Sequence, residues 1–154
     1  MRFLLLDRVT SLEPGRRIVG TSTFSLSDDL LAHHFPREPV VPAVLLLEAM
    51  AQLLGWGIAQ AHDFQHIPVL SLLEGVEIAR PRMRPGFVAA VTAEIVSTSA
   101  KDSLGRAFVT VSGERVVSAE RMIYKHFQAD DPEAMRQLFI YLRGEGAAGA
   151  GGLL

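Results

Sequence analysis

Three polar side chains with catalytic chemistry occur in one short apolar stretch, HFPREPVVPAVLLLEAMAQ (34–52). Burying a carboxyl among apolar residues costs free energy, so the position of Glu48 calls for a function. Apolar surroundings favour a protonated carboxyl, which can act as a general acid. Gln52 would lie one helical turn further along the same face and can orient that carboxyl. His34, in the preceding loop, offers a neutral imidazole as general base.

A helix that starts near Pro42 would position these groups. Proline suits the first position of a helix, and the apolar pattern continues from there to about His62. Apolar residues lie on all sides of the helix axis, which predicts a helix buried on most sides. Free backbone N–H groups at the helix start, notably that of Ala43, are expected to bind an oxyanion. A base, an acid and an oxyanion donor suit proton abstraction beside a thioester carbonyl, with loss of a β-hydroxyl.

The rest of the chain predicts an antiparallel sheet curled around this helix, and therefore an α+β fold. Segments rich in β-branched residues are expected as strands at 16–24, 66–79, 87–100, 105–113 and 115–127. The first fifteen residues are expected as a further strand or a helical turn, and residues 25–31 as a polar connection. Turns are expected at RPRMRPG (80–86), KDSLG (101–105) and SGE (112–114).

A short segment follows the sheet. Asp131 can cap, Pro132 can open and Gly144 can close a short amphipathic helix. We therefore expect a main domain at 1–127, a helical extension at 128–143 and a disordered tail rich in glycine and alanine at 144–154.

Composition excludes several classes of function. The chain has 154 residues, enough for one domain, and no cysteine, which excludes disulfides, thiolate nucleophiles and cysteine-based zinc sites and favours the cytoplasm. Its formal net charge of -2 gives no general attraction to nucleic acid or anionic lipid. The apolar stretch 40–56 contains Pro42, Glu48 and Gln52, which argues against a membrane span. The start of the chain is too short in apolar residues for a signal peptide.

The stretch around His34 and Glu48 resembles the active-site segment of the 3-hydroxyacyl-[acyl-carrier-protein] dehydratases of the FabA/FabZ type. Their pattern is approximately G-H-F-P-G-x-P-V-x-P-G-V-L, followed by an acidic residue and A-x-x-Q. The likeness extends to MRFLLLDRVTSLEPGRRIVG at the start and to EGVEIARPRMRPGF (74–87), and so covers residues 1 to about 126.

This resemblance implies a hotdog fold, assembly as dimers or trimers of dimers, and no cofactor. It implies that His34 and Glu48 carry the chemistry and that they can meet across a dimer interface. The implied reaction removes water from a (3R)-3-hydroxyacyl thioester, on acyl carrier protein or coenzyme A, to give a trans-2-enoyl thioester in fatty-acid or related lipid synthesis.

The chain departs from the family pattern at three glycine positions, which are His33, Arg37 and Ala43 here. Two alternatives to the dehydratase therefore stay open. One is a hotdog thioesterase, and the other is a non-catalytic acyl-binding member of the fold. Appearance of an enoyl product would support the dehydratase, and release of free thiol the thioesterase.

Two further groups of residues suggest binding. Arg80, Arg82 and Arg84 form either an ordinary solvated turn or a docking patch for an acidic carrier protein. The stretch HDFQH (62–66) has the spacing of a metal-binding pair, but it lies at the expected helix end and shows no third ligand. We therefore expect no metal.

Overall fold

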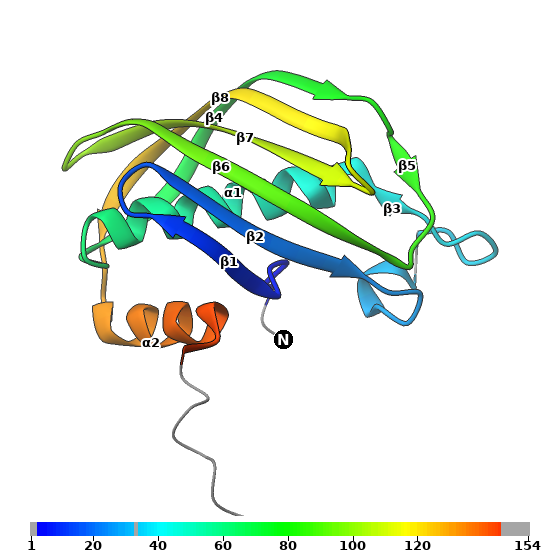
Figure 1. The fold of residues 1–154 in the computed structure, drawn as a ribbon, viewed down its shortest axis with the longest axis horizontal. Coiled ribbons are helices and arrows are strands. Elements are labelled where there is room, and N and C mark those ends of the chain that lie inside the picture. The colour runs from blue at the N-terminus through cyan, green and yellow to red at the C-terminus, as the bar shows by residue number, and fades with distance from the viewer. Residues whose placement is uncertain (1–2, 33, 146–154) are drawn as a thin grey trace, which may run out of the picture.

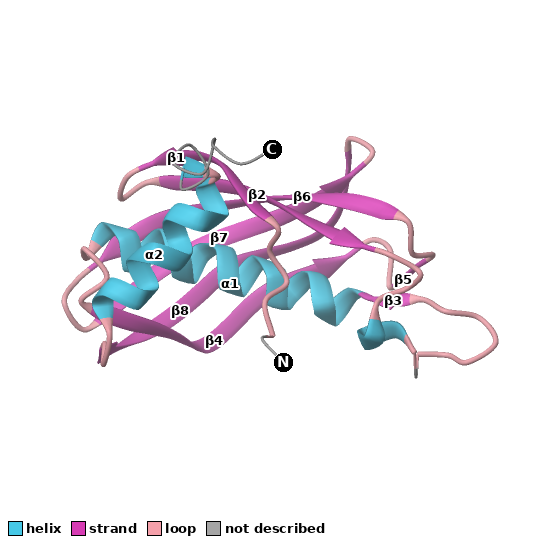
Figure 2. Ribbon diagram, turned by 90° about the horizontal axis from the view of Figure 1, so that it is seen from below, coloured by secondary structure: helices cyan, strands magenta, loops and turns pink. Residues whose placement is uncertain are grey.

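A computed structural model describes residues 3–32 and 34–145 of the chain. A six-stranded antiparallel sheet has the order β1-β2-β6-β7-β8-β4. Its strands are β1 (Arg8–Glu13), β2 (Arg17–Phe24), β4 (His66–Ile78), β6 (Phe87–Thr98), β7 (Asp102–Val111) and β8 (Glu114–Gln128). The sheet curls around the long helix α1 (Ala43–Ala61), and the shorter helix α2 (Pro132–Arg143) lies outside, near β1 (Figures 1 and 2). The expected α+β architecture is confirmed.

The core lies between α1 and the concave face of the sheet. Leu46, Leu53, Leu54 and Ile58 of α1 are completely buried. The sheet approaches the helix closely at Gly105 of β7, where a Cβ would lie 2.6 Å from Cδ2 of Leu54. α1 is long and apolar enough to cross a membrane, but 56% of its apolar window is buried inside the fold, as expected for a core helix.

The start of α1 differs from the sequence prediction by one residue. Pro42 precedes the helix instead of opening it, because its backbone is extended (φ -66°, ψ 142°). It belongs to β3 (Val41–Pro42), which pairs with β5 (Arg82–Met83) as a small second sheet. The segment 80–86, expected as a plain turn, therefore contains a strand that fixes the beginning of α1.

The turn between β6 and β7 also differs from the prediction. Strand β7 already begins at Asp102, inside the segment 101–105 that was expected to turn. The chain reverses at 99–102 instead, because the Ser99 hydroxyl accepts hydrogen bonds from the backbone N–H groups of Lys101 and Asp102. The turn between β7 and β8 is confirmed at Ser112 and Gly113, both of which have positive φ.

The C-terminal helix has the predicted caps. The Asp131 side chain accepts a hydrogen bond from the Ala134 N–H, Pro132 opens α2, and Gly144 ends it with φ of 73°. The short connection Asp29–Leu31 forms one turn of 3-10 helix within the segment expected to be a polar connection. Of the tail that was expected to be disordered, residues 146–154 lie outside the described residues.

Candidate active site

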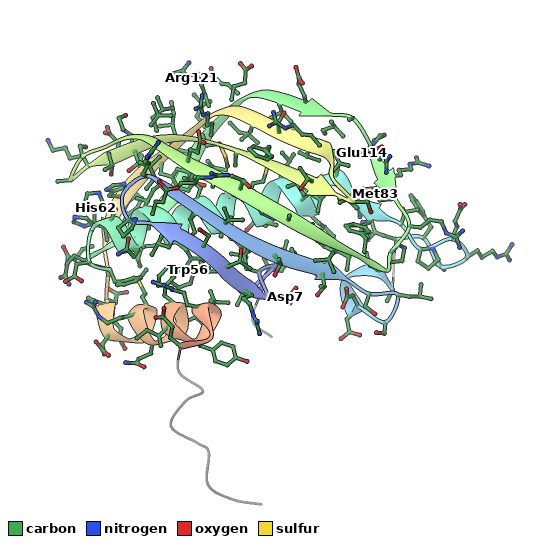
Figure 3. The ribbon with its side chains drawn as sticks, viewed as in Figure 1. Asp7, Trp56, His62, Met83, Glu114 and Arg121 are labelled. Atoms are coloured by element: carbon green, nitrogen blue, oxygen red, sulfur yellow. The ribbon has the colours of Figure 1, made fainter. Side chains whose placement is uncertain are left out.

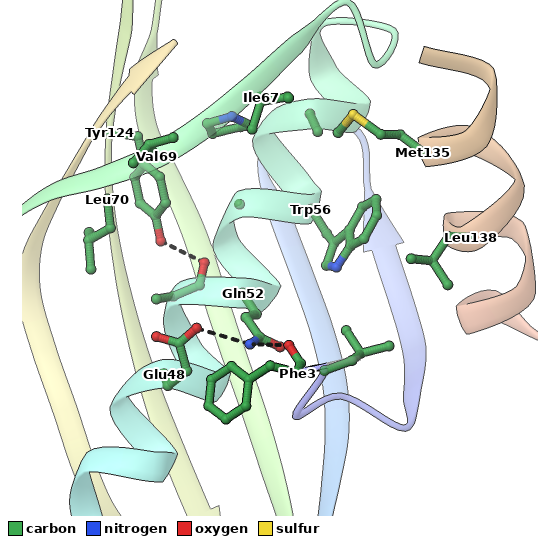
Figure 4. A pocket seen from close by; sticks show the side chains of 15 residues that line it. Phe3, Glu48, Gln52, Trp56, Ile67, Val69, Leu70, Tyr124, Met135 and Leu138 are labelled. Atoms are coloured by element: carbon green, nitrogen blue, oxygen red, sulfur yellow. Dashed lines mark hydrogen bonds between the residues drawn. The ribbon is translucent and has the colours of Figure 1, made fainter. Parts of the chain in front are cut away.

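A cavity of about 550 Å³ lies beside α1 and contains Glu48 (Figure 4). One stripe of α1 forms its floor, since residues spaced three or four apart lie on the same helical face. The walls come from the N-terminal segment, the start of β4, Tyr124 of β8 and two side chains of α2. Its lining is mostly apolar, with Glu48 and Gln52 as polar groups on the floor.

Gln52 holds the carboxyl of Glu48 and connects it to the N-terminal segment. Its Nε2 donates to Glu48 Oε1 at 2.9 Å and to the Phe3 carbonyl at 3.3 Å. Its Oε1 accepts from the Leu5 N–H at 2.8 Å. Glu48 is half-buried at the cavity surface. The arrangement gives a carboxyl one fixed orientation in an apolar site, as a positioned proton donor requires.

Tyr124 is a further cavity residue, which no sequence motif indicates. Its hydroxyl donates to the Ala51 carbonyl at 2.8 Å, and the side chain is buried. Burial, together with the nearby charge of Glu48, raises the pKa of Tyr124, so the phenol stays neutral beside the carboxyl. The alternation of buried Met122 and Tyr124 along β8 is the signal that points this ring inward.

His34 lies away from this cavity, in the exposed loop between the 3-10 turn and β3. Two backbone hydrogen bonds hold it there: its N–H donates to the Leu31 carbonyl at 3.0 Å, and its carbonyl accepts from the Val40 N–H at 2.9 Å. Among the described residues, none that lines the Glu48 cavity comes from this loop. A single chain therefore does not bring the predicted base and acid together.

The Ala43 N–H, expected to be free, has a partner in the structure. It donates to the Pro81 carbonyl at 3.3 Å. The cause is the pairing of β3 with β5, which brings residue 81 to the start of α1. The Ala43 N–H is therefore not an open oxyanion donor, as expected from the sequence, but takes part in a long hydrogen bond.

Two of the three candidate arginines, Arg82 and Arg84, lie beside the loop that carries His34. Arg80 forms an ion pair with Glu114. The guanidinium carbon of Arg82 lies 5.7 Å from the ring centroid of Phe35, which follows His34 in the chain. Arg82 and Arg84 line a hollow of about 400 Å³ together with Phe35 and Glu38. All three arginines are exposed, at the end of the molecule that Met83 and Glu114 mark in Figure 3.

The histidines of HDFQH gain a neighbour that the sequence did not indicate. This neighbour is His126 of β8, whose ring lies with those of His62 and His66 at the end of α1 away from Met83 (Figure 3). The centroids of the three rings are 5.0 to 5.6 Å apart. Two of the three rings bind hydroxyls through Nε2: His62 binds that of Thr98 at 2.6 Å and His126 that of Ser103 at 2.9 Å. In residues 3–32 and 34–145, no group of three potential ligands is arranged to hold a metal ion.

Solved structures with the same fold include dehydratases and thioesterases. The dehydratase heterocomplex ApeI:P from Xenorhabdus doucetiae matches with a TM-score of 0.67 at 17% identity, over 88% of this chain and 89% of that one. A hypothetical thioesterase with coenzyme A from Streptococcus pneumoniae matches with a TM-score of 0.61 at 14% identity, over 80% and 88%. These likenesses establish the hotdog fold.

Sequence comparison identifies the family. The FabA-like domain matches residues 1–74. The 3-hydroxyacyl-[acyl-carrier-protein] dehydratase FabZ of Clostridium novyi is 37% identical over 122 residues, which are 78% of this chain and 84% of that protein. The FabZ of Symbiobacterium thermophilum is 30% identical over 135 residues, or 87% and 94%. The chain belongs to the FabZ-type dehydratase family.

Proposed function

We propose that this protein removes water from (3R)-3-hydroxyacyl thioesters carried by acyl carrier protein, giving trans-2-enoyl thioesters in fatty-acid synthesis in the cytoplasm. The observation that carries the proposal is the Glu48 carboxyl, which Gln52 holds at 2.9 Å in an apolar cavity. Membership of the FabZ family supports it. The reaction needs no cofactor, because acid and base groups are sufficient for each step.

In the proposed mechanism, His34 from a second copy removes the α-proton, and the electron pair of the broken C–H bond moves onto the thioester carbonyl as an enolate before it forms the new C=C bond. The C–O bond to the β-hydroxyl breaks, and the carboxyl of Glu48 supplies the proton with which that oxygen leaves as water. Proton exchange through solvent returns both side chains to their starting forms. The Ala43 N–H of the copy that supplies His34 would stabilise the enolate oxygen, with the thioester oxygen replacing the Pro81 carbonyl as its hydrogen-bond acceptor.

The proposed second copy pairs along β4. This strand is an edge of the sheet, and it exposes five large apolar side chains, namely Ile67, Val69, Leu72, Val76 and Ile78. Unpaired strand edges of this kind favour pairing with another chain. β4 also forms a wall of the Glu48 cavity, so a partner at this edge would approach the site that lacks a base. A trimer of dimers is the larger assembly consistent with this unit.

Subunit complementation tests the function and the shared site together. We expect His34→Ala and Glu48→Gln each to reduce kcat on a 3-hydroxyacyl thioester by about 10² or more. Each heterodimer from an equal mixture of the two variants has one intact site. Random exchange makes half of the dimers mixed, so activity should return to about a quarter of wild type.

The outcomes separate the alternatives. Wild-type rates in both single variants would contradict the dehydratase, and failure of complementation in a mixed dimer would contradict the shared site. Light scattering that finds only a monomer would also contradict the shared site. Release of free thiol without enoyl product would identify a thioesterase, the activity named for one structural neighbour.

A further inference from the structure

The cavity beside Glu48 continues along α1 and ends against α2 (Figure 4). Its floor contains Glu48, Gln52, Gly55, Trp56 and Ala59. From Glu48 to Trp56 the helix rises by about 12 Å, at about 1.5 Å per residue. The cavity is therefore a channel with the carboxyl toward one end, and not a pocket around the carboxyl alone.

Two side chains of the C-terminal helix form the far end of this channel. Met135 and Leu138 project from α2 toward Trp56 and line the cavity (Figure 4). Both are half-buried and pack against the hydrophobic core. The main domain thus supplies the floor, whereas residues more than seventy positions further along the chain supply the end.

α2 is held firmly in this position. Phe139 stacks on Trp56, with ring centroids 6.0 Å apart, and also contacts Phe64 at 5.4 Å. Arg136 donates to the Asp63 carboxylate at 2.9 Å and lies over the Phe64 ring. These contacts attach α2 to the end of α1, so its apolar face is a fixed wall.

We propose that α2 limits the length of the acyl chain that this enzyme accepts, with Met135 and Leu138 as the residues that determine specificity. The inference rests on the proposed function, because it places the reacting β-carbon at Glu48. An extended hydrocarbon with C–C bonds of about 1.5 Å and angles of about 111° advances about 1.25 Å per carbon. About ten carbons beyond the β-carbon therefore reach Trp56, and longer chains meet α2.

Variants of α2 test this limit in opposite directions. Met135→Ala combined with Leu138→Ala lengthens the channel, and Leu138→Phe shortens it. Tyr141→Ala is the control, since this side chain is 75% exposed on the same helix. We would measure kcat/KM with 3-hydroxyacyl-coenzyme A substrates from butyryl to palmitoyl length.

The expected result is a change in the chain-length profile without a change in chemistry. Burial of each methylene in the channel raises affinity about fourfold, and a methylene that finds no space there does not contribute this gain. The double alanine variant should raise kcat/KM for the palmitoyl-length substrate at least tenfold. Leu138→Phe should reduce the length of the longest acyl chain that the enzyme accepts. Rates with the butyryl-length substrate should stay unchanged. An identical profile in all variants would overturn the inference.

Trp56 gives a second measurement that does not depend on turnover. It is the single tryptophan of the chain and lies in the channel floor, so its fluorescence reports occupancy. Titration with saturated acyl-coenzyme A of increasing length should show affinity rising with each carbon up to a limit. That limit should move outward in the double alanine variant. If the limit moves but no variant turns over substrate, the inference about α2 is supported and only the proposed dehydratase activity is contradicted. If the enzyme turns over substrate but the limit stays in place in the double alanine variant, the inference about α2 alone is overturned.

Discussion

At the residue scale, Gln52 connects the chemistry of the site to the fold around it. Its amide donates to Glu48 and Phe3 and accepts from Leu5, so both ends of the side chain are used. The N-terminal segment and the carboxyl on α1 are held by the same group. A change at Gln52 should therefore affect both catalysis and stability, whereas a change at Glu48 should affect mainly catalysis.

Replacing Gln52 with methionine tests this double role. The variant removes the donor to Glu48 and leaves the Leu5 N–H without its acceptor. We expect kcat to fall at least tenfold with little change in KM. The free energy of unfolding, measured with urea, should fall by about 1–3 kcal/mol.

Gln60 offers a matched control on the same helix. Its Oε1 is buried and has no hydrogen-bond partner in the described part of the chain. Gln60→Met should therefore change the free energy of unfolding little. A Gln52→Met enzyme with wild-type kcat would show that the amide does not position Glu48.

The histidine cluster should make stability depend on pH. Burial and then repulsion from neighbouring histidines lower the pKa of His62 and His126, although a backbone hydrogen bond with Ala100 and then the charge of Asp102 oppose this at His126. The unfolded chain therefore binds these protons at a higher pH than the folded protein does. As a result, the free energy of unfolding should decrease as the pH falls from about 7 to about 5.

Urea unfolding at several pH values checks this sign. The double variant His62→Gln with His126→Gln should show a flatter dependence over the same range. Asp102, whose pKa is lowered mainly by its hydrogen bond with Ser99, acts at lower pH and falls outside that window. Equal pH dependence in the wild type and the double variant would exclude the cluster as the cause.

At the element scale, periodic segments were predictable from the sequence and isolated pairings were not. The buried helix α1 and the long strands have strong apolar patterns, and α2 has clear cap residues. The small sheet of β3 and β5 joins residues about forty positions apart through two residues on each side, too few to show a pattern. It alters both the role of Pro42 and the freedom of the Ala43 N–H.

The candidate site was predictable in part, for the same physical reason. The spacing of Glu48 and Gln52 is local, and one helical turn brings them together as expected. The contacts of Tyr124 and Met135 with the cavity depend on tertiary packing. Sequence spacing likewise did not reveal that the loop of His34 lies apart from the cavity within one chain.

The contact of β7 with α1 leads to a prediction for Gly105. An added Cβ would lie 2.6 Å from Leu54 Cδ2 and 2.7 Å from the Glu94 carbonyl oxygen, so the strand must shift. We expect Gly105→Ala to lower the free energy of unfolding by about 1–3 kcal/mol. Gly55→Ala is the control, because its nearest neighbour is 3.8 Å away and alanine favours helix. Equal stability of both variants would contradict close packing at Gly105.

At the scale of the whole molecule, a formal net charge of -2 gives no general attraction to an acidic partner, so attraction must come from local groups of basic residues. Arg82 and Arg84 lie beside the loop of His34, and Arg80, at the same end, is already paired with Glu114. Steering of an acidic carrier protein would therefore depend mainly on the other two arginines. Local charge of this kind affects association more than it affects the fold.

Replacing Arg82 and Arg84 with alanine should weaken turnover of carrier-bound substrates several-fold, because rim charges contribute to encounter. The loss should be larger at low salt than at high salt, and coenzyme A substrates should be nearly unaffected. Arg121→Ala is a suitable control, since Arg121 is exposed on another surface and pairs with Glu74 (Figure 3). Equal losses with both kinds of substrate would indicate a structural role for the arginines.

The walls of the cavity come from distant parts of the chain, and this has a consequence for how such an enzyme diverges. Glu48 and Gln52 lie in the first half and at the middle of α1, whereas Met135 and Leu138 lie on a helix joined to the sheet by a short connection. Substitutions at separated sites usually act independently. Descendants of this sequence can therefore acquire new α2 side chains by single substitutions while inheriting the acid and its amide partner unchanged.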